Sequence, residues 1–380
     1  MLNTFIAYIL RFHKHFIAAS VIATVALFFW FAKIKIAATH EGYFPPKGDP
    51  EYEYFQKAIK TFGSNYYVII AINGNGSVFS YPMLEKIGKL TSKYEKLPTV
   101  KNVASLTSAV IIKSRHDEIL LKDISDSIPS TEAGIQKFRE DILGNPLYES
   151  NLVSKDEHST IIYVAIDENA PREASRKTID QIRQIAAAEF GAETIYITGE
   201  AMFDSLCYQK TWDDIRIFVP LIILLIALIV YLNFRNVWCV ILSIAYIIIA
   251  LEWTYSIMSI SNVSISLLTA SFLPVVAVVG ISNSVHFFTE YFRWRSQEKE
   301  PRQAVKETLQ DVLLPIWLKL LTTAIGFSSL ALVNVEAIKR MGVFLTVGVV
   351  SILLLITFFI PSIIILFTPK LSVEKQAELI

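Results

Sequence analysis

The segment that decides the fold is residues 264–291, SISLLTASFLPVVAVVGISNSVHFFTEY, which carries no charge before Glu290. An apolar run of this length predicts a helix that crosses a membrane. Its second half contains Ser282, Asn283 and His286 at spacings that place them near one another on a helix. Polar side chains in hydrocarbon are costly unless they face other helices or a wet cavity, so we expect an inward-facing polar stripe. The stripe either has a function or only hydrogen-bonds neighbouring helices.

The composition indicates a membrane protein with one sizeable soluble region. Hydrophobic residues make up 53% of the 380-residue chain, and the mean hydropathy is +0.45. The apolar runs cluster near the N-terminus and after residue 216, with a long hydrophilic stretch between them. The formal net charge is zero, so charge offers no argument for a nucleic-acid partner.

Six apolar runs are long enough to span a bilayer. The predicted spans are residues 16–32, 217–234, 237–258, 264–289, 313–333 and 341–367. The first run could be a signal peptide, but Lys33 and Lys35 follow it directly and no small-residue cleavage site is present. We therefore expect an uncleaved first span.

The positions of lysine and arginine predict the orientation. Most of the short-loop cations fall on one side of the predicted spans: Arg11, Lys14, Arg235, Arg293, Arg295, Lys299, Arg302, Lys306 and Lys370. Cytoplasmic loops carry this excess, although Lys339 and Arg340 oppose it mildly. Residues 1–15, 290–312 and 368–380 are thus expected in the cytoplasm, with an amphipathic surface helix starting near Pro301. Residues 33–213 are expected outside, which makes the protein a multi-pass protein of the inner (cytoplasmic) membrane.

The hydrophilic insertion alternates strand and helix patterns. Residues 66–72, 100–106, 159–167 and 194–199 read as strands, and helices are predicted from Pro82 and over residues 171–190. Two β-α-β units in tandem indicate a ferredoxin-like α+β domain. Residues 109–158 lie between the units and contain a further predicted helix over 132–143.

Two ionisable side chains lie within predicted spans. Lys319 is about 9 Å past Leu313, on the cytoplasmic side. It either reaches the cytoplasmic interface and pairs with Glu290 or Asp311, or it projects into the bundle at the depth of the polar stripe. Glu252 is about 22 Å into the third span. It is either an outer-interface residue in an aromatic belt or part of the functional polar group.

The sequence offers no enzyme or metal site. The acids and histidines of the hydrophilic region lack metal-ligand spacing: His116, Asp117, Glu118, Asp156, Glu157 and His158. Cys207 and Cys239 are predicted on opposite sides of the bilayer, so they cannot pair within one chain. No nucleophile–base pair is evident either. We therefore expect no metal, no cofactor and no catalytic activity.

The layout of one span, an α+β region and five spans resembles one repeat of the resistance-nodulation-division (RND) superfamily, nearest to its MMPL, Patched and sterol-sensing hydrophobe exporters. Matching segments are DPEYEYFQKAIKTFGSNYYVIIAI (49–72), KYEKLPTVKNVASLTS (93–108), ITGEAMF (197–203) and LKLLTTAIGFSSLAL (318–332). The last resembles the fifth-span signature of the family, carried here by Thr322, Thr323, Gly326 and Phe327. The resemblance implies six transmembrane helices with an extracytoplasmic ferredoxin-like porter domain between the first and second.

The fourth span departs from the pattern of this superfamily. The superfamily usually carries a Gly-x-Asp-Tyr-x-x-His-like motif there, whose Asp takes up the driving proton. Gly280 and His286 match this motif, but Ser282 stands in place of the Asp and Asn283 in place of the Tyr. Neither side chain titrates in a useful range. Coupling then uses His286, Lys319 or Glu252, lies in a partner, or does not exist.

Length is the second departure, because full members contain two such repeats. The resemblance implies a homodimer, a heterodimer with a second half-transporter, or a fragment of a longer chain. The expected function is transport of a lipid or other amphiphile across or out of the inner membrane. The alternative is a sterol-sensing-like lipid sensor or scaffold that does not pump, which would suit the missing acid.

Overall fold

The computed structural model describes residues 2–35, 49–63, 66–74, 76–115, 118–123, 128–191, 194–297 and 299–367. The chain forms two compact units. Met1–Tyr52 and Cys207–Ile380 form what we call the helical unit, and Glu53–Leu206 forms the α/β unit. The expected cytoplasmic tail, 368–380, lies outside the described residues, as do His116 and Asp117 of the charged loops.

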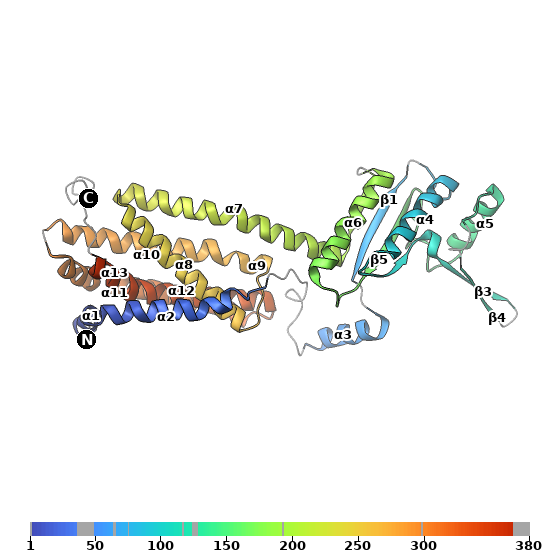
Figure 1. Cartoon of the computed structure of the whole chain (residues 1–380). Coiled ribbons are helices and arrows are strands. Elements are labelled where there is room, and N and C mark those ends of the chain that lie inside the picture. Colours follow the sequence, from blue (N-terminus) through green and yellow to red (C-terminus); the bar gives the residue numbers. More distant parts are fainter. Residues whose placement is uncertain are drawn as a thin grey trace. The chain divides into compact units, whose positions relative to one another are not determined.

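The helical unit consists of long apolar helices (Figure 1). Its elements are α1 (Leu2–Arg11), α2 (His13–Phe31), α7 (Glu200–Phe234, whose first turns belong to the α/β unit), α8 (Val237–Ile260), α9 (Leu267–Ala270), α10 (Phe272–Arg295), α11 (Pro301–Ser329), η3 (Leu330–Leu332), α12 (Glu336–Leu354), the π-helical turn η4 (Leu355–Phe359) and α13 (Ile360–Phe367). Six helical segments of the described chain are long and apolar enough to cross a membrane: α2, α7, α8, α10, α11 with η3, and α12 through α13. The number agrees with the six runs seen in the sequence.

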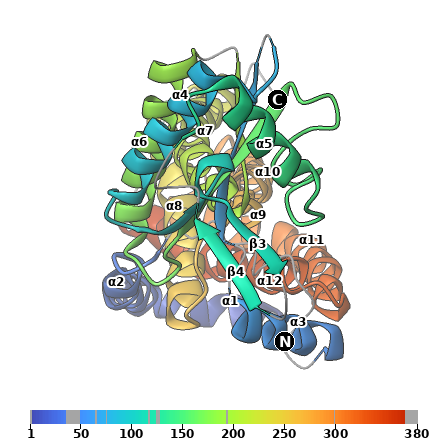
Figure 2. The same ribbon diagram turned by 90° about the vertical axis from the view of Figure 1, so that its right-hand side faces the viewer.

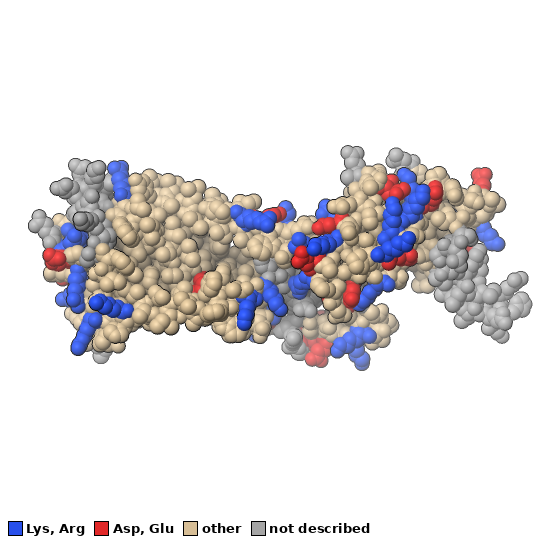
Figure 3. All heavy atoms as spheres, in the orientation of Figure 1, with Lys and Arg blue, Asp and Glu red and all other residues tan. Residues whose placement is uncertain are grey.

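The surface of the helical unit suits a lipid environment. Large apolar side chains such as Ile22, Phe29, Leu224 and Ile325 are more than 60% exposed on it. The visible face of this unit is nearly free of charged side chains between its two ends (Figure 3). Aromatic and aliphatic side chains of α8, α10 and α12 fill its interior. Exposed hydrocarbon of this extent is stable only where lipid, not water, surrounds the protein.

Several helices have bounds that differ from the expected ones. The helix expected from residue 264 begins at Phe272, because Ser266 and Thr269 cap a separate short turn, α9, and exchange hydrogen bonds there. Residues 290–312 do not form a loop with a separate surface helix. Residues 290–295 complete α10, and α11 runs without a break from Pro301 into the fifth span. The N-terminal region expected to precede the first span folds as α1.

Two prolines shape the last two spans. Pro361 follows the π-turn, in which the Ile360 N–H bonds the carbonyl of Leu355. Since proline has no N–H, the carbonyl of Thr357 loses its α-helical partner at this point, and the wider turn accommodates the loss. Pro315 lies inside α11 and has the same effect on the carbonyl of Asp311.

The α/β unit contains a four-stranded antiparallel sheet in the order β2-β5-β1-β6. Its strands are β1 (Tyr67–Asn73), β2 (Val100–Ala104), β5 (Ser159–Ile166) and β6 (Ile195–Thr198). Helix α4 (Tyr81–Glu95) connects β1 to β2, and α6 (Arg172–Phe190) connects β5 to β6. The two helices lie side by side (Figure 2). Alternate residues of β1 and β5 are buried, as expected for a sheet with one face covered.

The remaining elements of the α/β unit are α3 (Pro50–Phe62, which begins in the helical unit), the hairpin β3 (Val110–Arg115) with β4 (Glu118–Asp123), the short turn η2 (Leu106–Ser108) and α5 (Glu132–Leu143). The charged loop that follows α5 is held to that helix by an ion pair. Arg139 Nε of α5 donates to Glu157 of the loop at 2.7 Å. This ion pair lowers the pKa of the Glu157 carboxyl. Asp156 accepts from Ser154 and from the His158 amide, which likewise lowers its pKa. Within the described residues, no group of three His, Cys, Asp or Glu side chains could hold a metal ion.

Candidate functional site

Gly280 lets α10 approach α8 closely. A Cβ at this position would lie 2.5 Å from Ile247 Cγ1 and 3.3 Å from the Tyr246 hydroxyl. The fully buried Tyr246 hydroxyl donates to the carbonyl of Gly280. A buried phenol needs such a partner, so the bond holds the two helices in register. The face of α10 that follows Gly280 is thereby positioned next to α11.

The polar residues of α10 meet Lys319 of α11, and the two helices pack against each other. The Lys319 ammonium donates to Ser282 Oγ at 2.9 Å and to Asn283 Oδ1 at 3.1 Å. Asn283 is fully buried, and its amide nitrogen donates to the Val279 carbonyl at 2.7 Å. The amide orientation is therefore fixed with its oxygen toward the lysine. We call Ser282, Asn283 and Lys319 the lysine cluster.

The sequence led us to expect that the whole polar stripe points into the bundle. Only part of it does. Asn283 is buried, whereas Ser282 and His286 lie at the surface of the helical unit. Lys319 and Thr322 are also at this surface. The structure shows no hydrogen bond to the described His286 side chain. The reason for the split is the helix rotation: Ser282 and His286 are one turn apart on one side, and Asn283 is about 100° away.

The residues of the fifth-span motif follow Lys319 on α11. The hydroxyls of Thr322 and Thr323 each donate to the Lys319 carbonyl at 2.8 Å. Gly326 is exposed, and nothing lies within 4 Å of a Cβ built there. Phe327 packs against the core of the helical unit. The two threonines thus act on the backbone of α11 and do not contact the ammonium.

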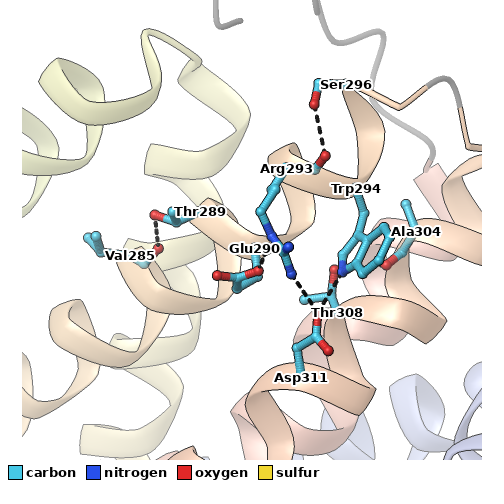
Figure 4. Close-up of polar contacts among 9 residues, drawn as sticks. All are labelled: Val285, Thr289, Glu290, Arg293, Trp294, Ser296, Ala304, Thr308 and Asp311. Atoms are coloured by element: carbon cyan, nitrogen blue, oxygen red, sulfur yellow. Dashed lines mark hydrogen bonds and ion pairs between the residues drawn. The ribbon is translucent and has the colours of Figure 1, made fainter. Parts of the chain in front are cut away.

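A second polar group lies between the C-terminal end of α10 and the N-terminal half of α11 (Figure 4). Arg293 of α10 bridges Glu290 and Asp311, with nitrogen–oxygen distances of 2.6 Å to each. Trp294 Nε1 also donates to Asp311, at 2.8 Å. Glu290 and Asp311, the two acids expected as alternative partners of Lys319, therefore both form ion pairs with Arg293. Of the two interpretations of Lys319, the structure has the one in which it meets the polar stripe.

Glu252 does not lie at an exposed interface. Its side chain is only 8% exposed, and one carboxylate oxygen accepts from Ser256 Oγ at 3.0 Å. The other oxygen is buried and has no hydrogen-bond partner among the described residues. The neighbouring Trp253 donates to Thr24 of α2, and Tyr255 stacks on Phe272. Helices α2 and α10 cover this end of α8, so the aromatic-belt interpretation does not fit.

Sequence reasoning missed Tyr246 and Arg293. Tyr246 lies within the apolar run of the third span and was not considered separately. A tyrosine hydroxyl in mid-span needs a hydrogen-bond partner, and Tyr246 could have been singled out for that reason. Arg293 was counted only as one of many cytoplasmic cations. The remaining candidates lie in two places: the lysine cluster with His286, Thr322 and Thr323, and the separate carboxyl of Glu252.

Comparison with known proteins gives a family and a similar fold. The sequence model of the MMPL family matches residues 80–378. A membrane protein of Methanocaldococcus jannaschii is 21% identical over 293 residues, which cover 75% of this chain and 71% of that protein.

A solved structure has a similar fold. The crystal structure of a heavy metal efflux pump superposes with a TM-score of 0.52 at 10% identity. The match covers 96% of this chain but only 48% of the pump chain, so this chain spans about half the length of that pump.

Proposed function

Because the chain belongs to the MMPL family, and thus to the RND-type transporters, we propose that it moves a lipid or other amphiphilic substrate across or out of the inner membrane. The observation that carries this proposal is the family match, which runs from α4 of the α/β unit through the last span. Six apolar helices and a polar cluster between two of them fit such a transporter. Polar groups inside a bilayer are costly and mark pathways or coupling sites.

The α/β unit is, in this proposal, a ferredoxin-like porter domain that stands outside the cytoplasm. The strand order β2-β5-β1-β6, with a helix after β1 and another after β5, supports the fold. The cations gathered near Arg293 and Arg302 support the side, because cytoplasmic loops carry the excess of lysine and arginine. The unit would receive the substrate from the outer leaflet.

The fourth span is atypical because Ser282 and Asn283 occupy the positions where the family carries its proton-binding acid and its tyrosine. We propose that coupling uses other groups. Glu252 is the acid buried among the described apolar spans, and one of its oxygens has no partner there. Lys319 supplies a positive charge at the depth of Asn283. Both are ionisable groups at positions where charge is expensive, which is typical of ion and proton pathways.

We propose further that the chain works as a dimer, with a second copy or with a different half-transporter. The chain covers about half of the pump with a similar fold. In addition, Ser282, His286 and Lys319 lie at the surface of the helical unit, where contact with lipid tails would be unfavourable. A second half packed on this face would remove them from lipid.

Transport of a fluorescent lipid from proteoliposomes tests the proposal. We expect flux with the wild-type chain that falls to background when the proton gradient is collapsed. Lys319→Met and Glu252→Gln should each reduce the flux at least about tenfold, equivalent to about 1.4 kcal/mol. Lys306→Met, a change at an exposed position earlier in α11, is the matched control and should leave flux unchanged.

A sensor would behave differently in the same assay. It would bind lipid but produce no gradient-dependent flux in any variant. Binding without flux in the wild type, measured with the same vesicles and with a verified gradient, would contradict the transporter proposal and favour the sensor.

A further inference from the structure

The Lys319 ammonium lacks a negatively charged partner in the described part of the chain. An ammonium has three protons, and here two of them are donated to neutral acceptors, Ser282 Oγ and Asn283 Oδ1. No ion pair joins Lys319 to a described carboxylate. A positive charge held by neutral groups in an apolar surrounding is costly, because their hydrogen bonds do not compensate its charge.

The nearest candidate acids are committed elsewhere. Glu290 and Asp311 are both bound to Arg293. Each lies eight residues from the lysine cluster along its own helix, Glu290 from Ser282 and Asp311 from Lys319. At the helical rise, this is about 12 Å toward the cytoplasmic end. Arg293 holds both carboxylates at that distance, which exceeds the Debye length of about 10 Å at ordinary ionic strength, so their attraction for Lys319 is weak.

The side chains on the exposed side of α10 near the ammonium are neutral groups that can donate hydrogen bonds, not acids. Ser282 accepts from Lys319 through its oxygen, which leaves its hydroxyl proton free to donate. His286 lies one turn further along the same exposed side of α10 and has no hydrogen bond with the described residues. A lysine ammonium forms strong, charge-assisted hydrogen bonds with anions such as phosphate, and a serine hydroxyl next to it can donate to the same anion.

We propose that the surface formed by Ser282, His286 and Lys319 binds an anion, either a small inorganic anion such as chloride or the phosphate of a lipid headgroup. Both sources supply the same chemistry: a negative charge that accepts hydrogen bonds from Lys319 Nζ and Ser282 Oγ. The anion neutralises Lys319 where the usual aspartate of the fourth span is missing. The site concerns binding, so it can exist whether or not the protein transports lipid.

Thermal unfolding of the full chain in phosphatidylcholine nanodiscs tests the small-anion source. We compare chloride and bromide with gluconate, a much bulkier anion, at equal ionic strength. Binding should raise the Tm in chloride or bromide by at least about 2–4 °C, with saturation. A second arm keeps gluconate and replaces part of the phosphatidylcholine by phosphatidylglycerol. A rise confined to this arm identifies the lipid phosphate as the anion, which also supports the site.

Variants decide whether the response belongs to the lysine cluster. Lys319→Met should abolish it, Ser282→Ala should weaken anion affinity at least about tenfold, and Lys319→Arg should retain it because guanidinium also binds anions. Lys306→Met on the same helix should respond like the wild type. If Lys319→Met does not fold, Ser282→Ala and Lys319→Arg decide by the same criteria. The proposal is overturned if the wild type responds in neither arm, or if Lys319→Met and Ser282→Ala respond as strongly as the wild type.

Discussion

Replacing Gly199 by alanine is expected to destabilise the α/β unit by about 2–6 kcal/mol. Gly199 joins β6 to α7 with a φ of +107°, a sparsely populated conformation that costs an L-residue about 1–3 kcal/mol. In addition, the new Cβ would lie 2.3 Å from the backbone oxygen of Tyr67 and 3.1 Å from the amide of Ile69. These atoms belong to β1, a central strand, so relief of the clash would disturb its pairing with two neighbours and add about 1–3 kcal/mol.

Gly191→Ala is the matched control for this change. Gly191 also has a positive φ, +82°, but nothing lies within 4 Å of its added Cβ. It should therefore cost only the conformational part, about 1–3 kcal/mol. All six tryptophans lie outside the α/β unit, so hydrogen exchange of the β1 and β5 amides is the suitable measurement. Equal loss of protection in the two variants would show that the close approach to Tyr67 is unimportant.

Replacing Gly280 by alanine is expected to loosen the contact between α8 and α10 and to cost about 1–3 kcal/mol. The added Cβ would meet Ile247 at 2.5 and 2.9 Å, and Cγ1, the closer of the two atoms, is not the free end of that side chain. The hydrogen bond from Tyr246 to the Gly280 carbonyl would lengthen as the helices separate. The lysine cluster follows within one turn, so anion or substrate binding there should weaken as well.

Gly326→Ala provides the contrast in a neighbouring helix. Its Cβ meets nothing within 4 Å, and alanine favours a helix over glycine by up to about 1 kcal/mol. We expect Gly326→Ala to be neutral or slightly stabilising in thermal unfolding followed by tryptophan fluorescence. If Gly280→Ala unfolds at the same temperature as Gly326→Ala, the close packing of α10 on α8 does not limit stability.

Much of the fold could be predicted because its signals are local. The six apolar runs, the strand patterns and the helix at Glu132–Leu143 depend on residues close in sequence. The break at Ser271 and the continuity of α11 could not be predicted in this way. The first depends on capping bonds between Ser266 and Thr269, and the second on packing of the segment after Pro301 against neighbouring elements.

The candidate site was predictable in its residues but not in its contacts. Depth along a helix placed Lys319 between Ser282 and the acids Glu290 and Asp311, and depth alone does not decide which of them it contacts. The choice depends on Arg293, which occupies both acids from another turn of α10. Similarly, the position of Glu252 in the sequence showed its depth, whereas its burial depends on how α2 and α10 cover α8.

Pro315 gives α11 a point of bending between its two polar groups. The proline removes the intrahelical bond to the carbonyl of Asp311, while Arg293 and Trp294 anchor the Asp311 side chain. A helix bends most easily at such a turn, so the part of α11 after Pro315 has more freedom to tilt than the part anchored through Asp311. A small tilt there would swing the Lys319 amine away from Asn283. Bending at Pro315 would thus change the contacts of the lysine cluster and leave the ion pairs of Arg293 intact.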